Sequence, residues 1–232
     1  MNIVFCRHRR TFSQWPVAAL CAVAMGFTSP CIAQSAGHWS YKIGENIIRP
    51  KVSSGDLTAP GAAGIKVDVG HAYAPVISGT TMLTDNIATE LMIGLPYRHD
   101  IFGKGTADGV GKIASVQQLQ PTLYLQYRFQ EAEARFRPYV GLGLTYAYFR
   151  DARPTSTLIA LLGPTTMEVD ARFGVTPQVG AIYRIDDRWF IDASASKTYL
   201  KTRATLTSGC IVRTIDMRLD PVAFNLAVGY RF

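Results

Sequence analysis

Beyond residue 34, hydrophobic and polar residues alternate with a period of two, which is the repeat of a β-strand whose two faces meet different surroundings. The last segment, Val222–Phe232, shows the pattern best. Its apolar positions are Val222, Phe224, Leu226, Val228, Tyr230 and Phe232, and the positions between them are Ala223, Asn225, Ala227, Gly229 and Arg231. One face of this strand is therefore apolar to the end of the chain.

The same period predicts eight strands. They cover Trp39–Ile48, Val76–Thr84, Ile87–Leu95, Thr122–Phe129, Phe136–Phe149, Phe173–Ile185, Trp189–Thr202 and Val222–Phe232. The second strand departs from clean alternation over Ile77–Met82, so the pattern does not fix its register.

The connections between these strands are alternately short and long. Short ones lie at Asp85-Asn86, Gln130–Arg135 and Asp186–Arg188, and long ones at Arg49–Pro75, Pro96–Gln120, Arg150–Met167 and Arg203–Ile215. Short periplasmic turns and long extracellular loops characterise outer-membrane barrels, and an even strand number places both termini on the periplasmic side. The predicted fold is an all-β, eight-stranded antiparallel transmembrane β-barrel.

Aromatic and charged residues bear on which face looks outward. Aromatic residues gather near the predicted turns, where an interfacial girdle is expected; they are Phe129, Phe136, Tyr183, Trp189, Tyr230 and Phe232. The alternative is a soluble eight-stranded barrel with an apolar interior, since alternation alone does not say which face is inside. The polar face carries both acids and arginines, which suits an enclosed ion-pair network better than a ligand cavity.

The first 33 residues have the features of a secretory signal peptide. Three arginines without an acid precede the apolar stretch Trp15–Phe27, and Cys31-Ile32-Ala33 places small residues at a cleavage site. The stretch is shorter than the roughly 20 apolar residues of a membrane-spanning helix. We therefore expect a signal peptide at residues 1–33 and a single barrel domain at residues 34–232.

Removal of the signal peptide changes the charge and the cysteine content. The whole chain has 24 Lys+Arg and 17 Asp+Glu, and without the three signal arginines the mature part keeps 21 basic and 17 acidic residues. This balance, without a basic stripe, argues against nucleic acid as a partner. Cys210 is the one cysteine left, in a turn-like stretch, so an internal disulfide is excluded.

Several motifs, in order along nearly the whole mature chain, resemble the outer-membrane protein W family. They are Thr84–Leu91, Pro96–Ile101, Arg137–Gly143, Asp220-Pro221 and the closing Gly229–Phe232. The resemblance implies an eight-stranded barrel in the outer membrane of a Gram-negative bacterium. It also implies a channel for small hydrophobic molecules that opens to the outside and releases them laterally into the bilayer.

The inward face supplies the candidate site. We expect these residues to line the lumen: Glu90, Met92, Tyr124, Gln126, Arg128, Gln178, Arg184, Asp192, Asn225 and Arg231. The charged ones lie near the turns and are expected to pair and to plug the periplasmic end, since unpaired buried charges are costly. Gly94, Gly141, Gly143, Gly174 and Gly180 leave an open lumen, make room for large neighbours, or only relieve the curvature of a small barrel.

Tyr230 and Phe232 resemble the terminal signal that the barrel-assembly machinery recognises. The expected partners are this machinery, the lipid of the outer membrane and small hydrophobic solutes. No catalytic residue, metal site or cofactor is expected, because the histidines are scattered and phosphate-loop spacing is incomplete. Two alternatives to a channel stay open. One is a membrane-embedded lipid-modifying enzyme, for which His99 is the candidate base, and the other is a structural or adhesive barrel that acts through its extracellular loops.

Overall fold

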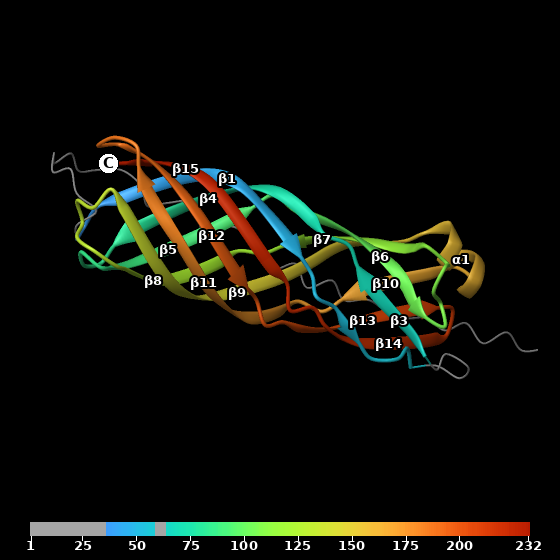
Figure 1. Ribbon diagram of the computed structural model, residues 1–232. Helices are drawn as coiled ribbons and strands as arrows, with labels where there is room; N and C mark the ends of the chain where they lie inside the picture. Colours follow the sequence, from blue (N-terminus) through green and yellow to red (C-terminus); the bar gives the residue numbers. More distant parts are fainter. Residues whose placement is uncertain (1–35, 59–63) are drawn as a thin grey trace, which may run out of the picture. The chain divides into compact units, whose positions relative to one another are not determined.

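The computed structural model describes residues 36–58 and 64–232, so the expected signal peptide lies outside the described residues. Eight strands form a closed antiparallel barrel in the order β11-β12-β15-β1-β4-β5-β8-β9, which the pairing of β9 with β11 completes (Figure 1). They are β1 (Trp39–Arg49), β4 (Ala72–Met82), β5 (Ile87–Gly94), β8 (Thr122–Arg128), β9 (Phe136–Pro154), β11 (Arg172–Arg184), β12 (Trp189–Lys197) and β15 (Val222–Arg231). All eight predicted strands are confirmed.

The long connections are more regular than predicted. They contain β2 (Ser53–Ser54), β3 (Ile65–Val69), β6 (Tyr97–Gly105), β7 (Lys112–Leu119), α1 (Ser156–Leu162), β10 (Thr165–Val169), β13 (Lys201–Ser208) and β14 (Ile211–Arg218). We call these elements the extension. In it β3, β6 and β7 continue from β9, and β10, β13, β14 and β2 form a separate four-stranded sheet. The one helix of the described residues, α1, is too short to cross a membrane.

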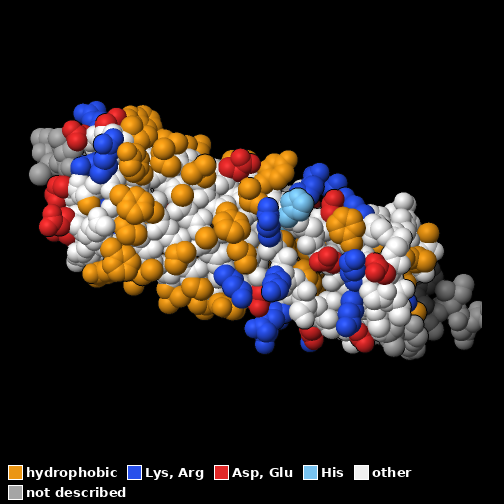
Figure 2. Space-filling model, viewed as in Figure 1, with side chains coloured by type: hydrophobic (Ala, Val, Ile, Leu, Met, Phe, Trp, Pro, Cys, Tyr) orange, Lys and Arg blue, Asp and Glu red, His pale blue; other side chains and the backbone are white. Residues whose placement is uncertain are grey.

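The apolar face of the barrel strands points outward. Large hydrophobic side chains stay exposed along all eight strands, whereas the alternate positions are buried inside the barrel. Figure 2 shows these side chains as an apolar belt across the face of the barrel that is turned toward the viewer. A soluble barrel with an apolar interior is thereby excluded, because its outer surface would be polar. The belt is the lipid-facing surface of a transmembrane barrel.

Aromatic side chains border this belt at both ends. The girdle predicted near the turns is present, with contacts such as Trp189 to Tyr230 at 5.1 Å between ring centroids. A second group, not predicted, contains Tyr73, Tyr146, Phe173 and Tyr199, all exposed. Along β11, the ten residue steps from Phe173 to Tyr183 span about 33 Å at ~3.3 Å per step. At a tilt of ~40° this gives roughly 25 Å, the usual height of the apolar band.

The second barrel strand keeps its alternation in spite of its polar sequence. Four alternate residues of β4 are buried: Val76, Ser78, Thr80 and Met82. The side chain of Ile77, which lies between Val76 and Ser78, is 56% exposed. Its neighbours fix this register, since Ile77 lies opposite Ile43 on β1 and Ile93 on β5. The ambiguity of the sequence pattern is thus resolved by pairing on both sides.

The inward glycines make room for large neighbours. Gly143 lies directly opposite Tyr124, and Gly180 opposite Tyr139. A Cβ atom at these glycines would come within 2.6 Å and 2.5 Å of the respective rings. At these two positions the structure supports room for large neighbours, because aromatic rings fill the space that the missing side chains leave.

Candidate functional site

A buried ion network lies inside the barrel, three residues from the periplasmic ends of β1, β5 and β12. The Lys42 ammonium lies 3.1 Å from Glu90 Oε2 and 2.9 Å from Asp192 Oδ2, and all three side chains are almost fully buried. Tyr139 donates its hydroxyl proton to Asp192, with oxygen distances of 3.1 and 3.2 Å. One cation therefore bridges two acids that come from β5 and β12.

Amide side chains extend this network across the barrel. Gln126 Nε2 donates to Glu90 Oε2 at 2.7 Å and to Gln178 Oε1 at 3.0 Å. Arg128 Nη2 donates to Gln126 Oε1 at 3.2 Å. Because strands β1, β5, β8, β9, β11 and β12 all contribute, the network joins most of the barrel wall through its interior.

Most of the residues predicted to line the lumen have buried side chains. They are Glu90, Met92, Tyr124, Gln126, Arg128, Gln178, Asp192 and Asn225, whereas Arg184 and Arg231 are half-buried. Met92 and Tyr124 belong to an apolar cluster with Ile48, Val76 and Tyr97 rather than to the ion network. The predicted set therefore divides into a charged group and an apolar group.

The expected partners of the two acids are different from those observed. We expected Arg128, Arg184 and Arg231 to pair with Glu90 and Asp192, but none of these arginines forms a salt bridge in the described part of the chain. Lys42 takes that place, and the prediction missed it. The signal was present, since Lys42 alternates with the exposed Tyr41 and Ile43 on β1.

The arginines instead gather at the periplasmic end. Arg137 donates to the carbonyls of Asp85 at 2.6 Å and Gln130 at 3.2 Å, which ties two turns together. Arg231 lies over the Phe190 ring at 5.5 Å, and that ring fills the space beside Gly229. These side chains close the barrel below the ion network.

Above the barrel the interior of the extension is apolar. One cavity of about 30 Å³ lies among Ile48, Val69, Met167, Leu219 and Pro221. A second, of about 60 Å³, reaches Leu158 and Leu162 of α1. Both are lined by Ile101, Met167 and Met217, so one apolar interior runs from the helix to the barrel mouth.

His99 is a polar exception in the wall of the lower cavity. Its Nδ1 donates to the Gly70 carbonyl at 2.9 Å, and burial lowers the pKa of the imidazole below its ordinary value. Its neighbour Asp100 lies on the other face of β6, where Lys112 approaches to 2.7 Å. His99 therefore lacks the orienting acid of a general base, which is the arrangement that the enzyme alternative requires. No group of three or more potential metal ligands occurs among the described residues.

The barrel wall has a gap in its hydrogen-bonded ladder. The β5–β8 ladder ends at Met92 and Thr122, and the β6–β7 ladder begins at Tyr97 and Gln118 with a changed register. Pro96 and Pro121 lie in the interval, one on each chain segment, and proline has no N–H to donate. The inner edge of the gap is the apolar cluster of Met92, Tyr97 and Tyr124.

Comparison with known proteins agrees with this geometry. The family model described as the OmpW family matches residues 35–232. The chain is similar to outer membrane protein W of Escherichia coli (strain K12), with 33% identity over 216 residues, 93% of this chain and 98% of that protein.

The crystal structure of OprG from Pseudomonas aeruginosa superposes with a TM-score of 0.79 at 27% identity, covering 86% of this chain and 99% of that one. A Pseudomonas aeruginosa protein named dibenzothiophene metabolism operon protein PahQ is 23% identical over 195 residues, 84% of this chain and 88% of that protein. The proteins named outer membrane protein are bacterial outer-membrane barrels. From its closed barrel, its lipid-facing belt and these matches, the chain belongs to the OmpW family of the Gram-negative outer membrane.

Proposed function

We propose that this protein is a passive channel through which small hydrophobic molecules cross the outer leaflet and leave sideways into the bilayer. The change of lining along the axis carries the proposal, because an apolar interior in the extension meets a charged network in the barrel. An apolar solute would lose several kcal/mol against such a network, whereas the bilayer core beyond the wall is apolar.

The ladder gap supplies the exit. Ile48 belongs both to the lower cavity and to the apolar cluster that ends at the gap. Leu95 lies on the outer side of the gap, and its side chain is 62% exposed on the lipid-facing belt. A solute that reaches the barrel mouth thus meets apolar side chains from the cavity, across the cluster, to lipid. The name of PahQ assigns that relative to a dibenzothiophene metabolism operon, and we propose for this protein a solute of the same aromatic, water-insoluble class, which suits the apolar interior.

The exit is tested by restoring the missing donors. In Pro96→Ala/Pro121→Ala both positions regain an N–H, so the ladders are expected to join and uptake of a labelled hydrocarbon to fall by roughly tenfold, the effect of ~1.4 kcal/mol on a barrier. Pro177→Ala is the matched control, because this exposed proline lies within β11 and away from the gap. Unchanged uptake by the double variant at equal barrel level contradicts lateral release.

The adhesive alternative makes a different prediction for the same cells. If the extension only binds envelope or host partners, hydrocarbon uptake does not depend on this protein, and cells with and without it take up the label equally. The comparison therefore separates the two functions before any variant is made.

We propose further that the terminal residues guide assembly. Phe232 is 67% exposed and its ring lies 5.1 Å from Tyr230 and 5.6 Å from Tyr41, in the girdle near the turns. Deletion of Phe232 is expected to lower the amount of heat-modifiable barrel severalfold without changing uptake per folded molecule. Equal outer-membrane levels of truncated and full-length chains would refute this role.

A further inference from the structure

Two neighbouring cross-strand pairs on the outer face of the extension differ in charge. Arg203 on β13 lies opposite Asp216 on β14, and two bonds of 2.6 and 2.8 Å join them. The next outward pair is Lys201 opposite Arg218. Like charges directly opposite each other destabilise a sheet. Asp220 lies 2.8 Å from Arg218, whereas no described acid pairs with Lys201, so this second pair keeps one positive charge in excess.

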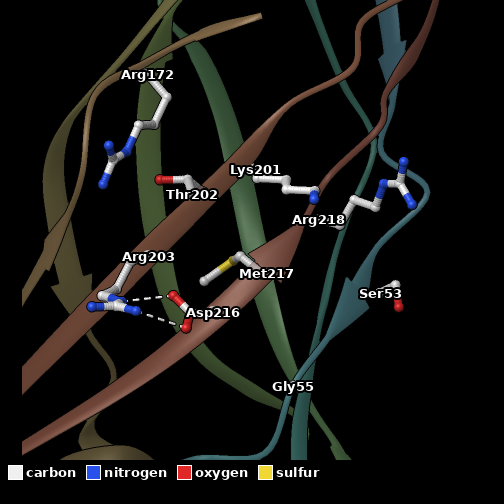
Figure 3. Close-up of a pocket in the computed structure, with 9 residues that line it drawn as sticks. All are labelled: Ser53, Gly55, Arg172, Lys201, Thr202, Arg203, Asp216, Met217 and Arg218. Atoms are coloured by element: carbon white, nitrogen blue, oxygen red, sulfur yellow. Dashed lines mark hydrogen bonds and ion pairs between the residues drawn. The ribbon is translucent and has the colours of Figure 1, made fainter.

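The two pairs line an open groove with a volume of about 630 Å³ (Figure 3). Its cations are Arg172, Lys201, Arg203 and Arg218, and its one acid, Asp216, is already bound to Arg203. Arg172 and Arg218 each have an aspartate partner at 2.9 and 2.8 Å, whereas Lys201 has no ion-pair partner in the described ranges. The volume is in the range of small-molecule sites.

The groove lies next to the edge of the lipid-facing belt. Arg172 directly precedes Phe173 of the second aromatic group, and Lys201 follows Tyr199 by two residues. At ~3.4 Å per residue, both cations stand within roughly 7 Å of the aromatic residues that mark the interface. Lys197, 4.8 Å from the Tyr199 ring centroid, adds charge at this level. Figure 2 shows Lys and Arg side chains where the apolar belt ends.

We propose that this groove binds the phosphate groups of a phosphorylated glycolipid in the outer leaflet. Guanidinium and ammonium groups donate several charge-assisted hydrogen bonds to phosphate, and an anion at Lys201 and Arg218 neutralises the positive charge that Asp220 leaves in excess. The groove extends from the membrane edge along the extension, and Ser53, paired with Arg218, offers a hydroxyl to a sugar. Phosphate and sugar on one lipid thus match the cations and the hydroxyl.

The test uses the full mature barrel in phosphatidylcholine nanodiscs with and without diphosphoryl lipid A, and native mass spectrometry counts the retained lipid. Lys201→Gln/Arg218→Gln is expected to lower the affinity by roughly tenfold or more, since hydrogen bonds to charged groups are the strong ones. Lys66→Gln/Lys104→Gln is the matched control. These two exposed lysines also lie opposite each other, on β3 and β6, and the double change removes the same charge.

Further arms of the experiment identify the ligand. Lipid A without its phosphates should bind the wild-type barrel no better than the Lys201→Gln/Arg218→Gln variant binds the phosphorylated form. Inorganic phosphate at the same concentration should neither bind nor displace the lipid. Equal losses in the groove variant and the control variant, equal retention of dephosphorylated lipid A, or full displacement by inorganic phosphate would each overturn the proposal. Because both substitutions are exposed, the heat-modifiable barrel should persist in every variant.

Discussion

Replacing Lys42 by methionine is expected to destabilise the barrel by about 3–5 kcal/mol, the usual cost of removing one partner of a buried ion pair. The lysine touches both Glu90 and Asp192, so its loss leaves two carboxylates facing each other in a closed interior. Unfolding in urea, followed by loss of the heat-modifiable band, measures the effect.

The neutral form of the network is the control. In Lys42→Met/Glu90→Gln/Arg128→Met/Asp192→Asn the sizes of the side chains are nearly kept and the network carries no charge, so most of the lost stability should return, as buried ion pairs are often replaceable by uncharged groups. If this fourfold variant is as unstable as the single one, packing of the Lys42 stem, and not the charge balance, explains the loss.

The sequence predicted the barrel well because lipid imposes a strict alternation. Each barrel strand has an exposed apolar row, such as Leu123 and Leu125 on β8, and this row is visible without any knowledge of its neighbours. The strands of the extension were missed because their buried rows are short and weakly apolar. In β13 the inward positions include Thr202 and Ala204, which a loop also contains.

The partners inside the barrel could not be predicted in the same way. Gly229 lies opposite Phe190, and Lys42 reaches Asp192 over 150 positions of sequence. Such contacts depend on the register of several strands and on closure of the barrel, whereas the alternation gives only the face of each residue. The sequence therefore predicted which side chains are buried with greater success than which ones meet.

Removal of the four charged side chains of the buried ion network separates the axial route from the lateral one. In Lys42→Ala/Glu90→Ala/Arg128→Ala/Asp192→Ala two positive and two negative side chains disappear together, so the net charge is unchanged and none of these charges stays buried without its partner. Ion conductance in planar bilayers should rise by roughly tenfold for each ~1.4 kcal/mol taken from the barrier.

Hydrocarbon uptake should change little in this variant at equal barrel level, because the proposed path leaves through the gap at Pro96 and Pro121, above the network. Combining the four substitutions with Pro96→Ala/Pro121→Ala should then give a barrel that conducts ions and still takes up little hydrocarbon. If uptake instead rises in step with conductance, apolar solutes follow the barrel axis, and the ladder gap has no part in their release.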